Sequence, residues 1–573
     1  MRIWNCFRYS WMLLCMGCIP FFSDAQEVID QRVFRNPLDG VLDISGTFCE
    51  IRSNHFHAGI DIRTGGVEGK PVYAVGDGYV SRIQISAYGY GKALYINHPN
   101  GFTSVYAHLQ IFNKNLHEYL RQKQYELKSW EIDIIPEPGE IPVKKGEVIA
   151  LSGNTGSSQG PHLHFEIRKT RNNQFVNPLL FGFNYKDSSP PQFKKLRLYY
   201  SNDSNLHGRK HIDYMVKKDA SGNYVLASNS KPEISGFMGI GVEVQDFQDL
   251  SGFRNDIYWM KVQAAGQLIY HIRFDSLPYE FGRFSNAHAD YWEYMVNTLR
   301  IHRAFRLPNL PLDNYLHLVN NGILHVNERK TVPVRIEIAD FKNNRAILEF
   351  SVNLSPATGK PDHTHRHLSW SNAHFLSIYG ISIKLEEGTL YEDVDLEFKS
   401  YDTLNRYSLP YVQIGNNTMP VQKEFEVEFE LPGLKKEWQN KLVLVWFNAK
   451  NQPKTYELKL QNERYFTRVK ELGLFTIWPD LKAPVITPLN LKDSSTVSLQ
   501  STLKVKIADD LSGIRSFKAY LDNEWFLMEY EYKENMLFHL PENRITPGWH
   551  AFALIVEDYV GNTTEYTANL LFE

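Results

Sequence analysis

The chain has 573 residues, a length that predicts about three to five domains, each able to bury its own core. Hydrophobic residues make up 43% and charged residues 22%, a balance typical of folded globular proteins. The 62 basic and 65 acidic residues give a net charge of −3, which indicates no nucleic-acid partner. No apolar run approaches the ~20 residues of a membrane-spanning helix. A polytopic membrane protein, a collagen and a disulfide-stapled mini-protein are therefore excluded, and the 13% of aromatic residues favours β structure.

The first 25 residues have the features of an export signal. Arg2 and Arg8 supply positive charge near a short apolar segment, Trp11–Phe22, and Ser23-Asp24-Ala25 has the small-x-small form of a cleavage site. A buried N-terminal helix is the alternative, and Pro20 argues against it. We therefore expect residues 1–25 to be a signal peptide.

The cysteines predict no disulfide. Lipidation of Cys18 is an alternative to simple cleavage, but Cys15 and Met16 fit a lipid-attachment motif poorly, so a lipoprotein anchor is not expected. Cleavage after Ala25 would leave Cys49 as the one remaining cysteine of four. Its simplest role is that of a small buried residue.

Residues 26–185 have the pattern of an antiparallel β domain. Short alternating strands are expected at Val72–Val75, Tyr79–Ile83 and Ala93–Ile96, with glycine turns between them. One segment departs from this pattern, because Leu109–Lys128 has helical spacing and many charges. We interpret residues 109–140 as a short helical insertion at the edge of the domain.

The rest of the chain is β-rich and aromatic. Ser188-Ser189-Pro190-Pro191 is a plausible linker. Beyond it we expect several Ig-like β-sandwich domains, over residues 190–355, 360–480 and 483–573, so the fold class is mainly all-β.

A short pattern recurs in this β-rich region. Each copy has the end of a strand, then an aspartate, then a glycine or asparagine turn. Such strand-plus-turn signals, spread over about 90–150 residues, are typical of sandwich domains. The four copies are Val244-Gln245-Asp246 with Leu250-Ser251-Gly252, Ile338-Ala339-Asp340 with Asn343-Asn344, Ile507-Ala508-Asp509 with Leu511-Ser512-Gly513, and Val556-Glu557-Asp558 with Gly561-Asn562.

Three short segments of the first domain concentrate histidines. They are His57-Ala58-Gly59-Ile60-Asp61, Tyr106-Ala107-His108-Leu109 and His162-Leu163-His164-Phe165-Glu166-Ile167. Residues i and i+2 of a strand point to the same face, so His162 and His164 project together while Leu163 and Phe165 face a core. Unrelated surface or core histidines are the alternative, but five such positions in three compact segments favour a site.

Two histidines and an aspartate can hold a divalent ion and leave one coordination position open. This is the arrangement of catalytic zinc, whereas structural zinc takes four protein ligands, usually with cysteine. No HExxH motif is present, so the zinc peptidases of that class are excluded.

The order HxxxD, YAHL and PHLHFE resembles the lysostaphin/LytM-type zinc metallopeptidases, a family of peptidoglycan endopeptidases. The neighbouring segments Asn54–Asp61, Val143–Ile149 and Gly153–Gly156 are similar as well. The resemblance covers residues 40–180, and it implies a barrel-sandwich hybrid with an open groove. The 109–140 insertion is longer than the family's usual link, so the substrate preference does not carry over.

The resemblance implies that His57, Asp61 and His164 bind Zn²⁺ and that His108 and His162 are catalytic. A zinc-activated water would attack a peptide carbonyl, and which histidine acts as the base stays open. Glu166 lies on the face of His164, either supporting it or simply solvated.

The expected function is that of a secreted zinc metallo-endopeptidase that hydrolyses the peptide stems of peptidoglycan in the periplasm or cell envelope of a bacterium. The alternative is a catalytically inactive LytM-like protein that binds the wall or activates another enzyme. No nucleic acid and no transmembrane segment in the mature chain are expected, and the C-terminal β domains have a possible protein partner.

One further group of histidines and one single histidine resemble metal ligands. His363, His365 and His367 lie in a Pro/Gly region and are interpreted as a solvated loop. His55 lies two residues before His57 and is out of register with the HxxxD motif.

Overall fold

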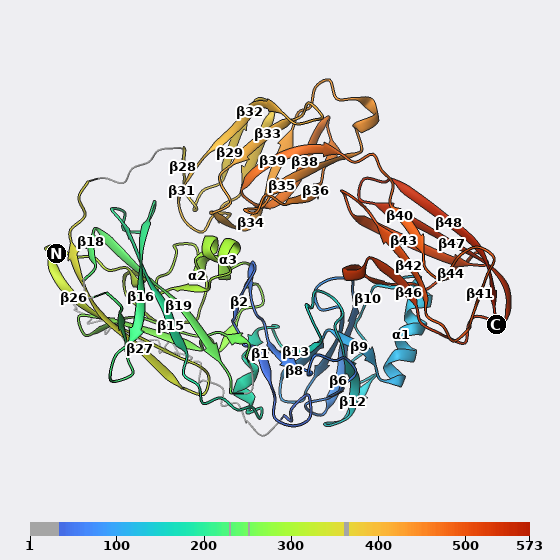
Figure 1. The fold of residues 1–573 in the computed structure, drawn as a ribbon, viewed down its shortest axis with the longest axis horizontal. Coiled ribbons are helices and arrows are strands. Elements are labelled where there is room, and N and C mark those ends of the chain that lie inside the picture. The colour runs from blue at the N-terminus through green and yellow to red at the C-terminus, as the bar shows by residue number, and fades with distance from the viewer. Residues whose placement is uncertain (1–33, 229–230, 250–251, 360–365) are drawn as a thin grey trace, which may run out of the picture.

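The computed structural model describes residues 34–573 except 229–230, 250–251 and 360–365. The expected signal peptide, its cleavage site and Cys18 lie outside the described residues. Four β-rich units follow one another around a ring, and the last returns to the first (Figure 1). None of the helices in the described part of the chain is long and apolar enough to cross a membrane.

The first unit is built on a largely antiparallel sheet in which β13 is central. The sheet order is β1 (Ile44–Gly46), β4 (Ile60–Arg63), β13 (His162–Lys169), β8 (Phe102–Ala107), β7 (Lys92–Asn97), β6 (Gly78–Ile85), β10 (Ile132–Ile134), with β11 (Pro142–Val143) on β6 and β14 (Phe175–Val176) between β13 and β23 (Ser276–Leu277). A second sheet has the order β5 (Pro71–Tyr73), β12 (Val148–Ser152), β9 (Leu109–Phe112), and β2 (Ile51–Arg52) pairs with β3 (His55–Phe56).

The alternation of β13 fixes which of its side chains face the core. Leu163 and Phe165 are fully buried in the hydrophobic core of this unit, as the period of two predicts. His162 and His164 therefore lie on the opposite face. Cys49 is buried and unpaired, as expected.

The helix of the insertion is shorter than its sequence pattern predicted. Helix α1 spans Lys114–Leu127, and Asn113 caps it by accepting a hydrogen bond from the amide of Leu116. The preceding Leu109–Phe112 is strand β9, paired with β12. The expectation of a helix from residue 109 was wrong because Leu109 and Phe112 are buried by this pairing before the cap can form.

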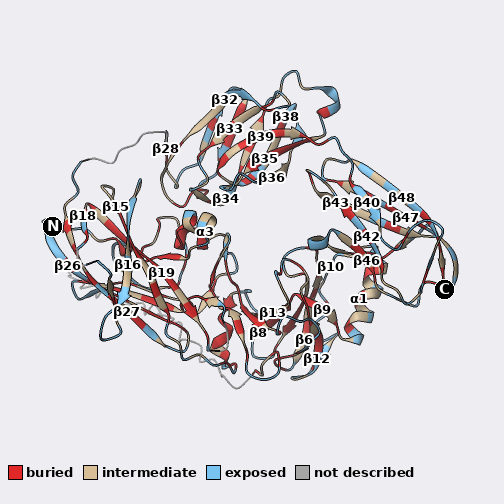
Figure 2. Cartoon of the chain, viewed as in Figure 1, coloured by how far each residue is buried: buried red, intermediate tan, exposed pale blue. Residues whose placement is uncertain are grey.

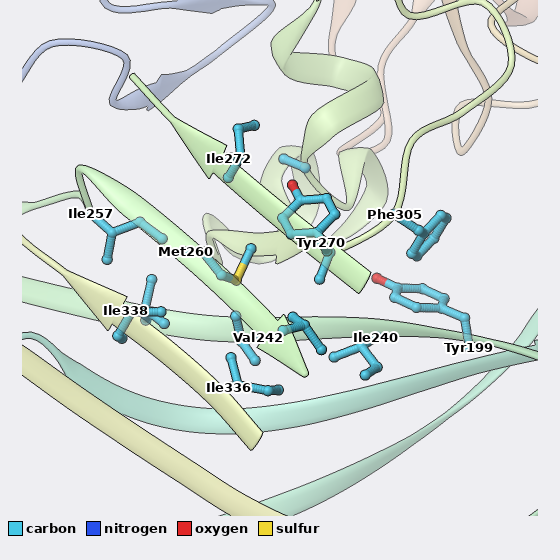
Figure 3. Packing of buried hydrophobic residues seen from close by; sticks show 14 of the residues in the cluster. Tyr199, Ile240, Val242, Ile257, Met260, Tyr270, Ile272, Phe305, Ile336 and Ile338 are labelled. Atoms are coloured by element: carbon cyan, nitrogen blue, oxygen red, sulfur yellow. The ribbon is translucent and has the colours of Figure 1, made fainter. Parts of the chain in front are cut away.

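The second unit is a twelve-stranded sheet with a large core (Figure 3). Its order is β20 (Arg254–Asn255), β19 (Phe237–Phe247), β15 (Gln192–Ser201), β16 (Lys210–Lys218), β17 (Tyr224–Leu226), β27 (Arg345–Ser355), β26 (Lys330–Ala339), β21 (Trp259–Ala264), β22 (Gln267–Arg273), β25 (Tyr315–Leu318), with β18 (Glu233–Ser235) on β27 and β24 (Ile301–Arg303) on β19. Helix η1 (Pro178–Phe181) closes the first unit, and the helices of the second are α2 (Ser285–His288), α3 (Tyr291–Asn297) and η2 (Asn320–Gly322). Its core continues into the first unit through Phe48, Phe56 and Phe175, so the two units share one apolar interior.

The third and fourth units each bury residues between two sheets (Figure 2). The third has β29 (His374–Ile378), β30 (Ile381–Leu385), β34 (Pro420–Phe429), β38 (Arg464–Glu471), β37 (Lys459–Gln461) and, in the other sheet, β32 (Phe398–Leu404), β33 (Pro410–Ile414), β39 (Gly473–Pro479), β35 (Leu442–Phe447), β36 (Pro453–Glu457), besides β28 (Arg366–Leu368), β31 (Val394–Leu396) and η3 (Lys436–Trp438). The fourth has β40 (Val485–Pro488), β42 (Leu503–Ala508), β46 (Met536–His539), β45 (Glu529–Glu531) and β41 (Ser495–Val497), β48 (Thr563–Phe572), β47 (Gly548–Asp558), β43 (Ile514–Leu521), β44 (Glu524–Phe526), with η4 (Tyr532–Glu534).

A buried ionic contact joins the fourth unit to the first. Glu529 is 5% exposed and pairs with Lys92 at 2.8 Å and with Arg121 of α1 at 2.9 Å. Aromatic side chains surround this contact, with Trp525 against Tyr125 and Phe517 against Trp130. The fourth unit therefore packs against the insertion of the first unit, residues 109–140.

We predict that Glu529→Gln separates the fourth unit from the first. Losing one partner of a buried pair costs about 3–5 kcal/mol, because the other charges stay buried without compensation. Small-angle scattering should show a larger radius of gyration for this variant, and Glu534→Gln, at an exposed position of η4, should leave the scattering unchanged. Unchanged scattering of Glu529→Gln would contradict the prediction.

The same contact should weaken in acid. Burial raises the pKa of Glu529, but Lys92 and Arg121 lower it further, from an ordinary value of 4.5 to about 2. A folded-state pKa below the unfolded one gives stability that is full above pH 4.5 and is lost as the pH falls toward 2.

Candidate metal centre

The pairing of β13 with its two neighbours assembles the centre. His164 of β13 lies directly opposite Asp61 of β4, and on its other side opposite Ala107 at the end of β8. His108 follows Ala107 directly and turns into the left-handed region, with a φ of 57°. His57 comes from the loop between β3 and β4, so three strands and one loop meet here.

Three side chains offer ligand atoms to one point. The Nε2 atom of His57 lies 3.0 Å from Oδ1 of Asp61 and 3.0 Å from Nδ1 of His164, and the last two atoms are 2.9 Å apart. All three residues are buried. A tetrahedral ion with bonds of 2.0–2.1 Å separates its ligand atoms by about 3.3 Å, so a small outward shift of the triangle accommodates one.

The outer nitrogen of each histidine ligand is fixed by a hydrogen bond. Nδ1 of His57 donates to the carbonyl of Thr47 at 2.9 Å, and Nε2 of His164 donates to Oε1 of Glu166 at 3.0 Å. Each inner nitrogen can then carry the lone pair that a metal needs. Glu166 is fully buried, so it supports His164 and is not a solvated strand residue.

Glu166 is itself held as an anion. The hydroxyl of Tyr90 donates to it at 2.5 Å, and Nε of Arg168 donates at 2.7 Å. Burial raises the pKa of Glu166, but Arg168 and the hydrogen bonds of His164 and Tyr90 lower it to about 2. The carboxylate therefore stays ionised at neutral pH and fixes the ring of His164.

A chain of ion pairs holds the other oxygen of Asp61. Nη2 of Arg52 donates to Oδ2 of Asp61 at 2.9 Å, and Nε of Arg52 lies 3.2 Å from the buried Glu50. Glu50 in turn pairs with Arg300 of the second unit. Arg300, Glu50 and Arg52 thus form a chain of ion pairs from the second unit to Asp61 of the candidate centre.

His108 and His162 flank the ligand triangle. Nδ1 of His108 donates to the carbonyl of Thr155 at 2.8 Å, and Nδ1 of His162 donates to that of Gly160 at 2.8 Å. Nε2 of His162 lies 3.4 Å from Oδ1 of Asp61, so it faces the triangle. Burial, followed by the neighbouring His164 and His162, lowers the pKa of His108 to about 3, which leaves the ring neutral at pH 7.

The fourth unit contacts the loop that orients His108. Nζ of Lys533 donates to the carbonyl of Gly156 at 3.1 Å and to that of Asn154, the residues on either side of Thr155. The ring of Tyr532 packs against Tyr88, with 4.5 Å between the ring centroids. Lys533 of the fourth unit therefore contacts the segment whose Thr155 carbonyl accepts a hydrogen bond from His108.

The structure brings together all five residues that the sequence singled out. The sequence did not predict the residues that hold them, which are Glu50, Arg52, Tyr90, Thr155 and Arg168. One signal was available, because His162, His164, Glu166 and Arg168 alternate along β13 and share a face. His367 lies with His207 and Asp395 in a second group whose ligand atoms are within 4.8 Å, whereas His363 and His365 lie outside the described residues. His55 is exposed and hydrogen-bonds to the carbonyl of Ser53 at 2.9 Å.

Comparison with known proteins places this centre in a family. Residues 55–125 and 138–178 match the family model of Peptidase family M23, and residues 365–480 match that of a Zu5-like domain. The chain carries an M23 peptidase domain.

Three relatives share this M23 domain. An uncharacterized metalloprotease of Haemophilus influenzae is 32% identical over 165 residues, 28% of this chain and 29% of that protein. DD-carboxypeptidase/endopeptidase Mpg of Neisseria meningitidis serogroup B is 37% identical over 123 residues, 22% of each chain. Lipoprotein NlpD of Yersinia enterocolitica is 32% identical over 116 residues, 20% of this chain and 93% of the lipoprotein. The chain thus spans less than a third of the first two relatives.

We predict that Arg52→Ala weakens metal binding by the M23 domain about 10–100-fold, the usual effect of removing a group that orients a ligand. The measurement is a titration of the metal-free chain with Zn²⁺. Arg82→Ala is a matched control, because the side chain of Arg82 is 33% exposed against 32% for Arg52 but pairs with Asp133 instead. Equal affinities of the two variants would show that Arg52 does not orient Asp61.

We predict that metal binding releases about one proton per ion at pH 7.5. Burial lowers the pKa of His164, but hydrogen bonds to Asp61 and Glu166 raise it to about 9, whereas burial lowers the pKa of His57 to about 4. A protonated His164 must lose its proton to bind an ion, so the affinity should fall about tenfold per pH unit below 9. Calorimetry in two buffers of different ionisation enthalpy measures the proton count. Glu166→Gln should reduce it, and a count near zero for the unaltered chain would contradict the prediction.

Proposed function

We propose that the chain is an exported zinc endopeptidase that hydrolyses peptide cross-links of bacterial peptidoglycan. The observation that carries this proposal is the triangle of ligand atoms from His57, Asp61 and His164, each within about 3.0 Å of the next, with His108 and His162 beside it. The M23 domain and the Neisseria meningitidis relative, named a DD-carboxypeptidase/endopeptidase, support the substrate class.

The donor set suits zinc. Two imidazole nitrogens and one carboxylate oxygen leave a fourth position open, as in catalytic zinc sites. Bound zinc would supply a Lewis acid that lowers the pKa of a coordinated water to about 7 and polarises a peptide carbonyl.

His108 and His162 would then transfer the protons of the reaction. Because Nδ1 of His108 and of His162 donates to a backbone carbonyl, Nε2 is the nitrogen of each ring that can act as a base. A neutral imidazole can take a proton from the attacking water, and the protonated ring can give it to the leaving amine. The second imidazole can donate a hydrogen bond to the oxyanion that develops on the carbonyl.

Alanine substitutions test these roles. We predict that His57→Ala, Asp61→Ala and His164→Ala lose both zinc and hydrolysis, whereas His108→Ala keeps zinc and loses about 10²–10⁴-fold in rate. The readouts are zinc content and mass spectrometry of muropeptides released from peptidoglycan, with and without a chelator. His55→Ala is the matched control, since it changes an exposed histidine two residues from a ligand.

Two outcomes would contradict the proposal. Unchanged zinc content in all three ligand variants would overturn the metal assignment. A zinc-loaded chain that binds peptidoglycan without releasing new muropeptides would instead support a wall-binding or enzyme-activating role.

A further inference from the structure

Two groups of three aspartates occupy corresponding places in the second and fourth units. The first is Asp187, Asp246 and Asp340, and the second is Asp480, Asp509 and Asp558. Within each group, ligand oxygens from all three residues lie within 4.8 Å of one another. We infer that each group binds one Ca²⁺ ion and that the two ions stiffen the joints between consecutive units.

The chain builds both groups in the same way. In each, the first aspartate stands four residues before a proline, Asp187 before Pro191 and Asp480 before Pro484, just ahead of the first strand of its unit. The second closes a strand, Asp246 in β19 and Asp509 after β42, and the third does the same, Asp340 after β26 and Asp558 in β47. Four of the six are the aspartates of the recurring strand-plus-turn pattern.

An asparagine supports the group in the second unit. The amide N of Asn344 donates to Oδ1 of Asp340 at 3.0 Å, and its side-chain Nδ2 donates to Oδ2 at 2.7 Å. The same Nδ2 donates to the carbonyl of Asp187 at 3.2 Å. One side chain therefore ties two of the aspartates together.

The fourth unit repeats this geometry. The amide N of Asn562 donates to Oδ1 of Asp558 at 2.7 Å, Nδ2 donates to Oδ2 at 2.7 Å, and Nδ2 donates to the carbonyl of Asp480 at 3.2 Å. The second and fourth units differ in sheet topology but have the same arrangement of three aspartates and one asparagine.

Lysines act on both groups only from a distance: Lys342 lowers the pKa of Asp187, and Asp480 raises the pKa of Lys482. Among the described residues, no ion pair includes any of the six carboxylates. Lys342 places its Nζ over the ring of Tyr185, 4.2 Å from the centroid, and forms no ion pair with the first group. Buried carboxylates that lie together without a counter-ion are costly, so the group needs protons or a cation.

Polar atoms without partners point to a ligand. Oδ1 of Asp246 and the hydroxyl of Tyr185 have no hydrogen-bond partner, and the two residues are only 2% and 5% exposed. Both line a cavity of about 20 Å³ together with Asp187 and Asp340, which is room for one ion or water. In the fourth unit, Oγ of Ser512 is likewise buried without a partner, while its amide donates to Asp480 at 2.9 Å.

In the first group, the neighbouring carboxylates raise one another's pKa. Burial, followed by Asp187 and Asp340, raises the pKa of Asp246 to about 8, and burial with Asp340 raises that of Asp187 to about 7. A divalent cation would replace these protons at neutral pH.

The donor chemistry selects the ion. All donors are oxygens, which hard cations prefer, and neither group contains the nitrogen or sulfur donors that favour zinc. Calcium accepts six to eight oxygens in irregular geometry, whereas magnesium demands a near-ideal octahedron and keeps its waters.

The position of each group gives the ion a structural role. Asp187 follows the last helix of the first unit, η1, and Asp480 follows β39 of the third unit directly. The other two aspartates of each group belong to the next unit. An ion bound by all three therefore fixes the angle at which one unit meets the next.

The test is a calcium titration of the full chain, freed of metal and then supplied with one equivalent of Zn²⁺. Calorimetry should count two Ca²⁺ ions per chain, with dissociation constants of about 10⁻⁴–10⁻³ M as in extracellular modules. Millimolar CaCl₂ should raise the unfolding temperature, and MgCl₂ at the same concentration should raise it less. No calcium binding at millimolar concentration would overturn the inference.

Asparagine variants separate a calcium site from a hydrogen-bonded cluster. Asp246→Asn and Asp558→Asn should each reduce the count from two ions to one, and the double variant should bind none. Without calcium, Asp246→Asn should unfold at a higher temperature than the unaltered chain, because a neutral amide avoids the cost of burying a carboxyl beside Asp187 and Asp340. Asp402→Asn, at an exposed position of β32, controls for the loss of a charge. Two bound ions in the double variant, with unchanged zinc content and circular dichroism, would contradict the assignment.

Discussion

The backbone register between β13 and β4 is the constraint on which the candidate centre depends. It sets His164 opposite Asp61, so two of the three ligand atoms meet before any side chain adjusts. A slip of one residue would turn both histidines of β13 into the core and bring Leu163 and Phe165 to the surface. The fully buried Leu163 and Phe165 make that slip unfavourable, so the hydrophobic core holds the candidate metal ligands in place.

Around this register, buried charges extend outward in two directions. Glu166 and Arg168 continue the face of β13, and Arg52 and Glu50 lead to Arg300 in the second unit. Asp61 and His164 are thereby oriented by groups that are themselves paired, which limits the motion of the centre before a metal binds. The second unit thus contributes to the centre electrostatically although it supplies no ligand.

The sequence predicted the ligands because they lie in short motifs with a strand period. It could not predict Arg52 or Thr155, because their contacts with Asp61 and His108 depend on how distant segments pack. The insertion shows the same limit, since a helical pattern from residue 109 concealed the strand Leu109–Phe112 that β12 completes. The recurring aspartates looked like turn signals for a similar reason. They form groups with Asp187 and Asp480 only because three distant segments pack together, and a local sequence pattern does not predict such packing.

The return of the fourth unit to the first has a mechanical consequence. The first two units share one core, so the ring consists of that pair, the third unit and the fourth, and a change of angle at one joint must be compensated at the others. The placement of the fourth unit is therefore tied, through Lys533, to the carbonyls of Asn154 and Gly156, on either side of the Thr155 carbonyl that accepts a hydrogen bond from His108.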